Sequence, residues 1–162
     1  MQPSAEEFCG LLMKAVAEKW GYVWGLNGEV WTTERAEKYK KDRRSPPAGN
    51  SPSTYWTVRC AKWYGRMAAD WSGLIGWALR RLGAFGPKQD MGSGAFIGAC
   101  KTAGSIKSSL PQEDGLLLWR SGHVGILYQG EVSEAKGTDY GVVYGVSPPS
   151  SFTKWGYLPY LT

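Results

Sequence analysis

The sequence predicts an α+β domain in which N-terminal helices pack on a central antiparallel β-sheet of about five to six strands. Apolar residues recur at helical spacing up to Gly104, whereas short strand patterns separated by glycine-containing turns follow Gly115. Helices followed by antiparallel strands are typical of α+β folds with segregated layers. A length of 162 residues suits a single domain with a substantial core, and we expect one domain over 1–162.

The first predicted helix begins at a capping box made by Ser4 and Glu7, and it ends near Gly21. Its apolar stripe has helical spacing and consists of Phe8, Leu11, Leu12, Ala15 and Val16.

Residues 26–60 are expected to form an irregular, basic insertion. Part of it, from Thr33 to about Lys41, has helical character, but the proline-rich run over 45–52 cannot form a regular element. The basic side chains here are most simply a solvated face, and contact with a cell wall or with phosphate groups is the alternative.

A central helix is predicted from Asp70 to Leu82, followed by Gly83 at the position that favours glycine after a helix. Its apolar positions are Leu74, Ile75, Ala78, Leu79 and Leu82. The start of this helix offers free N–H groups and the positive end of the helix dipole, which favour an anion or a thiolate. The residue found there is Trp71, which supplies neither.

A third helix is expected from a cap at Ser93 through Ala103, with Gly104 ending it. Phe96, Ile97 and Cys100 would face inward, and Cys100 is interpreted as a core residue. Five strands are then predicted at Gly115–Trp119, His123–Tyr128, Glu131–Lys136, Val142–Val146 and Trp155–Tyr160.

A two-residue loop at Gln129–Gly130 predicts a β-hairpin. Its register places Glu134 opposite Gly125 and makes it the diagonal neighbour of His123, about 7 Å away between Cβ atoms. A carboxylate there would fix the tautomer of His123 and leave the other ring nitrogen as a base. Lys136, opposite His123, competes for the same carboxylate, and a structural histidine is the alternative interpretation.

Composition narrows the class of protein. The formal net charge of +5 suits an anionic partner, such as a bacterial cell wall or nucleic acid. Nine Trp and nine Tyr indicate a groove for a sugar or peptide, or else large residues in a small core. There is no 18-residue apolar run and no signal-peptide core at the start. Three widely spaced cysteines and one histidine indicate neither a disulfide framework nor a zinc site, so no cofactor or metal is expected.

Three pieces occur in order: Gly21–Gly25 after the first helix, Ala69–Ile75 opening the central helix, and His123–Tyr128 running into Gly130–Thr138. Together they resemble the NlpC-type papain-like cysteine peptidases that cut bacterial peptidoglycan, and most of all those of phage lysins. The resemblance covers nearly the whole chain, and residues 26–60 match worst.

The resemblance implies a papain-like α+β core with a Cys nucleophile at a helix N-terminus. It implies that His123 is the general base and that Glu134 orients it. The residues it places at the substrate are Asp70 and Ser72, which flank the nucleophile, and the aromatic residues Tyr22 and Trp24. The family motif is Asp-Cys-Ser-Gly, and Trp71 stands at the nucleophile position.

An indole cannot attack a carbonyl, and loss of a catalytic nucleophile costs on the order of 10⁶ in turnover. We therefore expect a hydrolase domain that is inactive as written, with the indole of Trp71 projecting into the substrate groove. The alternative is a pseudoenzyme that binds peptidoglycan peptides. A nucleic-acid-binding role for the basic run Arg35–Arg44 lacks a recognised motif. The resemblance further implies a monomer that acts on stem peptides without nucleic acid or membrane, made in the cytoplasm and acting at the cell wall.

Overall fold

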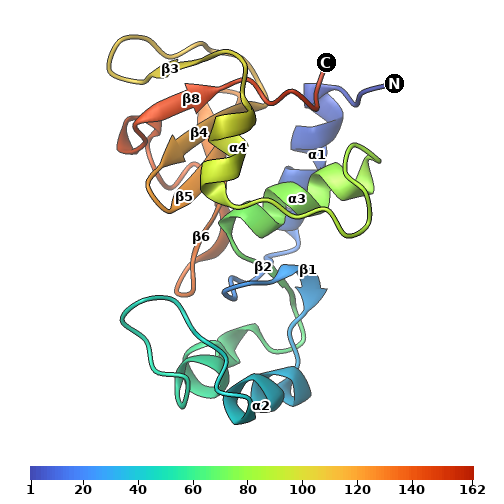
Figure 1. Cartoon of the computed structure of the whole chain (residues 1–162), viewed down its shortest axis with the longest axis vertical. Helices are drawn as coiled ribbons and strands as arrows, with labels where there is room; N and C mark the ends of the chain where they lie inside the picture. Colours follow the sequence, from blue (N-terminus) through green and yellow to red (C-terminus); the bar gives the residue numbers. More distant parts are fainter.

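The computed structural model describes residues 1–162 as a helix-and-sheet body with a smaller lobe beside it (Figure 1). The body contains one six-stranded sheet in the order β3-β8-β4-β5-β6-β7, with every neighbouring pair antiparallel. Its strands are β3 (Ala103–Ser105), β4 (Leu116–Arg120), β5 (His123–Tyr128), β6 (Glu131–Gly137), β7 (Gly141–Tyr144) and β8 (Lys154–Gly156), with a short 3₁₀ turn at Pro149–Ser151. The predicted α+β class and antiparallel sheet are confirmed.

Two of the three predicted helices form where the sequence places them. Helix α1 (Ala5–Ala17) begins at a complete capping box between Ser4 and Glu7. Helix α3 (Trp71–Arg81) is capped by Asp70 and is followed by Gly83 at φ +75°. This positive φ explains the glycine, because other residues rarely adopt it.

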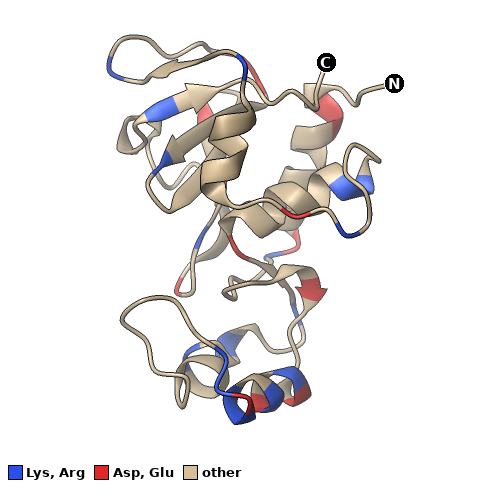
Figure 2. Ribbon diagram, in the orientation of Figure 1, with Lys and Arg blue, Asp and Glu red and all other residues tan.

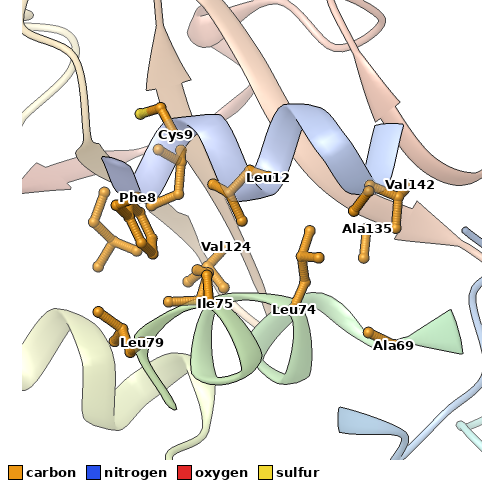
Figure 3. Close-up of a cluster of buried hydrophobic side chains, with 14 of the residues drawn as sticks. Phe8, Cys9, Leu12, Ala69, Leu74, Ile75, Leu79, Val124, Ala135 and Val142 are labelled. Carbon is orange, nitrogen blue, oxygen red and sulfur yellow. The ribbon is translucent and has the colours of Figure 1, made fainter. Parts of the chain in front are cut away.

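The main core lies between these two helices and one face of the sheet. Figure 3 shows Phe8 and Leu12 of α1 approaching Leu74 and Ile75 of α3, with Val124 of β5 beside them. The opposite face of the sheet has its own buried cluster, made of Leu116, Leu118, Leu127, Val132 and Phe152. Both faces are therefore covered, which holds β5 and β6 firmly in place.

The third helix is shorter than predicted. Helix α4 spans Ser93–Ala99, and its N-cap is Gly92 rather than Ser93. The backbone of Cys100 is extended, which ends the helix. Ala103–Ser105 then pairs with β8 as edge strand β3 instead of continuing the helix. The prediction fails because pairing with β8 decides this stretch, and Gly98 and Gly104 lower its helix propensity. Cys100 is partly buried against the main core, as interpreted.

Residues 26–66, called the small lobe below, are more regular than predicted. Strand β1 (Asn27–Val30) pairs antiparallel with β2 (Met67–Ala69), which closes the lobe against the body. Between them lie helix α2 (Thr33–Lys41), as predicted, then a π-helical turn (Tyr55–Arg59) and a 3₁₀ turn (Ala61–Trp63). Its buried cluster is Val23, Leu26, Trp31, Ala36, Tyr55, Trp56, Cys60 and Ala68. The lobe is held together by aromatic side chains from distant positions, so its sequence has no local periodicity from which the structure could be predicted.

None of the helices combines the length and the apolar character needed to cross a lipid bilayer.

Candidate active site

The start of α3 is fastened to the segment that precedes the small lobe. Asp70 Oδ1 accepts the N–H of Gly73 at 2.7 Å, and Oδ2 accepts the N–H of Gly25 at 3.0 Å. The hydroxyl of Ser72 lies 3.5 Å from the same Oδ1. Residues 21–26, called the aromatic turn below, are thus held against the first turn of α3.

Gly73 is required by this close approach. A Cβ at Gly73 would collide with the backbone carbonyl of Leu26, which cannot move away as a side chain can. Burial raises the pKa of Asp70 to about 6, although the N–H groups of Gly73 and Gly25 favour its ionised form. Both carboxylate oxygens of Asp70 are used within the chain, so its cap role is built into the fold.

Trp71 is the first residue of α3, and its side chain is partly buried. The indole meets three aromatic rings. Its ring centroid lies 5.1 Å from that of Trp24, 5.7 Å from Tyr22 and 5.6 Å from the imidazole of His123. Tyr22 is only 2% exposed and packs within the site, whereas Trp24 is partly exposed beside Trp71. The helix start and the histidine predicted from separate parts of the sequence therefore lie together.

The predicted hairpin is confirmed at its loop. Gln129 and Gly130 both have positive φ, and the ladder pairs Tyr128 with Glu131 and Ile126 with Ser133. Positive φ at both loop positions matches the type I′ turn, whose twist suits a hairpin. The ladder stops at Ile126–Ser133, so the predicted pairs nearer to His123 do not form.

His123 and Glu134 nevertheless come close. His123 is 4% exposed, and its Nε2 lies 3.8 Å from Oε1 of Glu134, which is 1% exposed. This distance is too long for a hydrogen bond, but it brings the carboxylate and the imidazole close together. The ring of Phe152 lies nearly parallel to the imidazole, with centroids 5.7 Å apart, and covers it. A Cβ at Gly125, between these two positions, would meet Val132 and Phe152.

Ser147 also belongs to this site, and the sequence pattern does not predict it. Its hydroxyl donates to Glu134 Oε1 at 2.6 Å and accepts from Lys136 Nζ at 2.8 Å. Lys136 Nζ itself lies 3.9 Å from Oε1. The lysine expected to compete with His123 for the carboxylate therefore bonds to the Ser147 hydroxyl, which in turn bonds to the carboxylate. Ser147 follows β7, two strands from β5, and no local pattern marks it; only the β6–β7 pairing brings it to the carboxylate.

The carboxyl group of Glu134 is kept ionised. Burial raises the pKa of Glu134, but the nearby His123, the Ser147 hydroxyl and Lys136 outweigh burial and hold it below its usual range. Oε2 of Glu134 and Nε2 of His123 are both buried without a hydrogen-bond partner. A carboxylate facing the Nε2 edge of a histidine favours the tautomer with its proton on Nε2, which leaves Nδ1 free to act as a base.

No group of three or more His, Cys, Asp or Glu side chains is arranged to hold a metal ion. All three cysteines are free: Cys9 and Cys60 are buried, and Cys100 is partly buried. Burial raises the pKa of the thiols of Cys9 and Cys60 to about 12, which keeps both protonated near neutral pH.

No protein-family model matches the sequence, and no curated protein matches it. Among solved structures, the chain is similar to the peptidoglycan hydrolase RipB from Mycobacterium tuberculosis, with 18% sequence identity and a TM-score of 0.43. The similarity covers 92% of this chain and 64% of the RipB chain, so this chain spans less than two thirds of that structure.

Proposed function

We propose that this chain is a cell-wall hydrolase domain of the NlpC cysteine-peptidase type whose nucleophile position is occupied by Trp71. In this proposal it binds peptidoglycan stem peptides and does not cleave them. One observation supports it above all: the first side chain of α3 lies against His123, and the Nε2 edge of His123 faces the buried carboxylate of Glu134. These are the positions that nucleophile, base and orienting acid require.

A thiol at position 71 would find its chemistry prepared. The start of α3 stabilises a thiolate, because its free N–H groups and dipole favour negative charge. His123 would take the thiol proton at Nδ1 and later pass it to the leaving amine. Glu134, itself fixed by Ser147, would hold the imidazole and stabilise its charged form. An indole offers no electron pair for attack on a carbonyl carbon, and Ser72, one residue further along the helix, points about 100° away.

We assign peptide binding to the solvent-exposed side of the same site. Trp24, Trp71 and Ser72 are partly exposed and adjacent, so they offer flat apolar faces and one hydroxyl to an extended peptide. Tyr22 and Asp70 shape this surface from beneath. We further propose that residues 1–162 act as one monomeric domain, as in a phage lysin made in the cytoplasm and acting at the wall.

The test is Trp71→Cys, assayed by release of soluble peptides from purified peptidoglycan, with Trp71→Ala as the matched control. The alanine variant also removes the indole but supplies no thiol, so it separates the effect of losing the indole from restored chemistry. We expect cleavage by Trp71→Cys alone, and its loss when His123→Ala is added. If Trp71→Cys and the parent both bind peptidoglycan and neither cleaves it, the chain is a binding module only. If neither binds, the proposal is wrong.

A further inference from the structure

Arg44 is held at the edge of the aromatic turn without an acidic partner. Its Cζ lies 4.1 Å from the ring centroid of Tyr39, and it takes part in none of the ion pairs of the structure. Its backbone is fixed at both groups, because its N–H donates to the carbonyl of Tyr39 and its carbonyl accepts from the indole of Trp56 at 3.0 Å. An exposed but oriented guanidinium without a carboxylate is available to an external anion.

The guanidinium lies next to the candidate site. A Cβ built at Gly25 would be 3.2 Å from Nη2 of Arg44, so the guanidinium rests against this residue of the aromatic turn. Gly25 follows Trp24, whose indole contacts Trp71, and its N–H is bound to Asp70. The aromatic turn therefore carries Trp24 toward the site and supports Arg44 at the site's rim.

The charge of the molecule is concentrated around this residue. Nine Lys and Arg and four Asp and Glu lie in the small lobe, which accounts for the whole net charge of +5; the remaining residues have ten of each. In Figure 2 many of the ribbon positions of Lys and Arg lie along α2 and the segments beside it, with a few acidic positions among them. Such a one-sided field raises the local concentration of an anionic ligand before any specific contact forms.

We propose that Arg44 forms a carboxylate-binding subsite for the peptide that lies across Trp24 and Trp71. This inference rests on the proposed function only in that the site accepts a peptide. The guanidinium presents a planar fork of donors that matches a carboxylate with two parallel hydrogen bonds. Its stacking on Tyr39 orients that fork in advance, so less side-chain freedom is lost on binding. The ligand class is therefore a peptide with a free carboxylate a short distance from the segment on the indoles.

The experiment compares the affinity of the parent protein, which carries Trp71, for two probes. One is N-acetyl-Ala-Ala with a free C-terminal carboxylate, and the other is the same peptide as its C-terminal amide. Binding is followed by NMR through the indole N–H signals of Trp24 and Trp71 and the amide signal of Gly25. We expect the carboxylate peptide to bind about tenfold more tightly or better, as a charge-assisted pair provides. Arg44→Gln should remove this preference.

Lys41→Gln is the matched control, because Lys41 is exposed at the same end of α2 and its loss changes the net charge equally. It should keep the preference to within about twofold, since it is unpaired and forms no ordered contact with the aromatic turn. Equal affinity of the two probes, an equal loss in both variants, or no change in the Trp24 and Trp71 signals would each overturn the subsite. Failure of Trp71→Cys to cleave, with the carboxylate preference intact, would instead reject the hydrolase proposal and leave the subsite standing.

Discussion

Asp70 should make the stability of this protein depend on pH in a direction opposite to that of most paired carboxylates. Burial raises the pKa of Asp70 from 3.8 to about 6, so the folded protein holds the proton more tightly than the unfolded chain. Folding stability from this group is therefore fully present below pH 4 and is lost as pH rises through about 6. One pKa unit corresponds to about 1.4 kcal/mol, so the whole shift is worth about 3 kcal/mol. About 2 kcal/mol of this falls between pH 4 and pH 7, because the unfolded carboxyl is already partly ionised at pH 4.

The substitution Asp70→Asn tests this, because an asparagine side chain cannot ionise. Its amide will fit one of the two N–H partners poorly, and that cost is independent of pH. The difference in unfolding free energy between parent and variant should therefore shift by about 2 kcal/mol in favour of the variant from pH 4 to pH 7. Urea unfolding of both proteins at pH 4, 5, 6 and 7 measures it. Other groups, including Glu134 with its lowered pKa, cancel in the difference. A difference that stays constant with pH, or moves the other way, refutes the assignment of a buried carboxyl at the start of α3.

Three further outcomes follow from the packing and from the His–Glu pair. Gly73→Ala should lower the unfolding free energy by about 2 kcal/mol or more, because its Cβ meets a backbone carbonyl, whereas Gly10→Ala, with open space around it, should be neutral or stabilising by thermal melting. Glu134→Gln should change the ¹⁵N shifts of His123 away from the form protonated on Nε2; because the chain has one histidine, the signal is unambiguous, and unchanged shifts would refute the pairing. Tyr55→Phe should cost about 1–3 kcal/mol in urea unfolding, since it removes a hydroxyl that accepts a backbone N–H of the aromatic turn; a cost below about 0.5 kcal/mol would contradict this role.

The parts of the site that were predictable are those set by local sequence. The capping pattern at Asp70 fixes where α3 begins, and the loop of Gln129 and Gly130 fixes the hairpin register. Because side chains alternate along strands, that register puts His123 and Glu134 on the same face even though the ladder ends before reaching them. Local rules thus sufficed for the two elements that carry His123 and Glu134.

The rest depends on contacts between distant positions. Ser147 reaches Glu134 only through the β6–β7 pairing, and Arg44 reaches the aromatic turn only because the small lobe folds around its own aromatic cluster. Residues 32–55 are rich in proline and basic residues and give no periodic signal over most of their length. Trp31 and Trp56, at the two ends of this segment, are nevertheless fully buried. The sequence pattern predicts elements well where periodicity is local, and it is silent where single large side chains from separate segments meet.

Trp71 is tolerated because its surroundings suit an indole better than a buried core would. A bulky residue forced into a packed interior costs about 1–3 kcal/mol or more through strain. Here the side chain is partly exposed and meets Trp24, Tyr22 and His123 at tilted or edge-on angles, the geometry that aromatic pairs favour. The same contacts place apolar surface over the imidazole that a thiol would need. The aromatic turn therefore supports the indole of Trp71, and it is the same element to which we assign peptide binding.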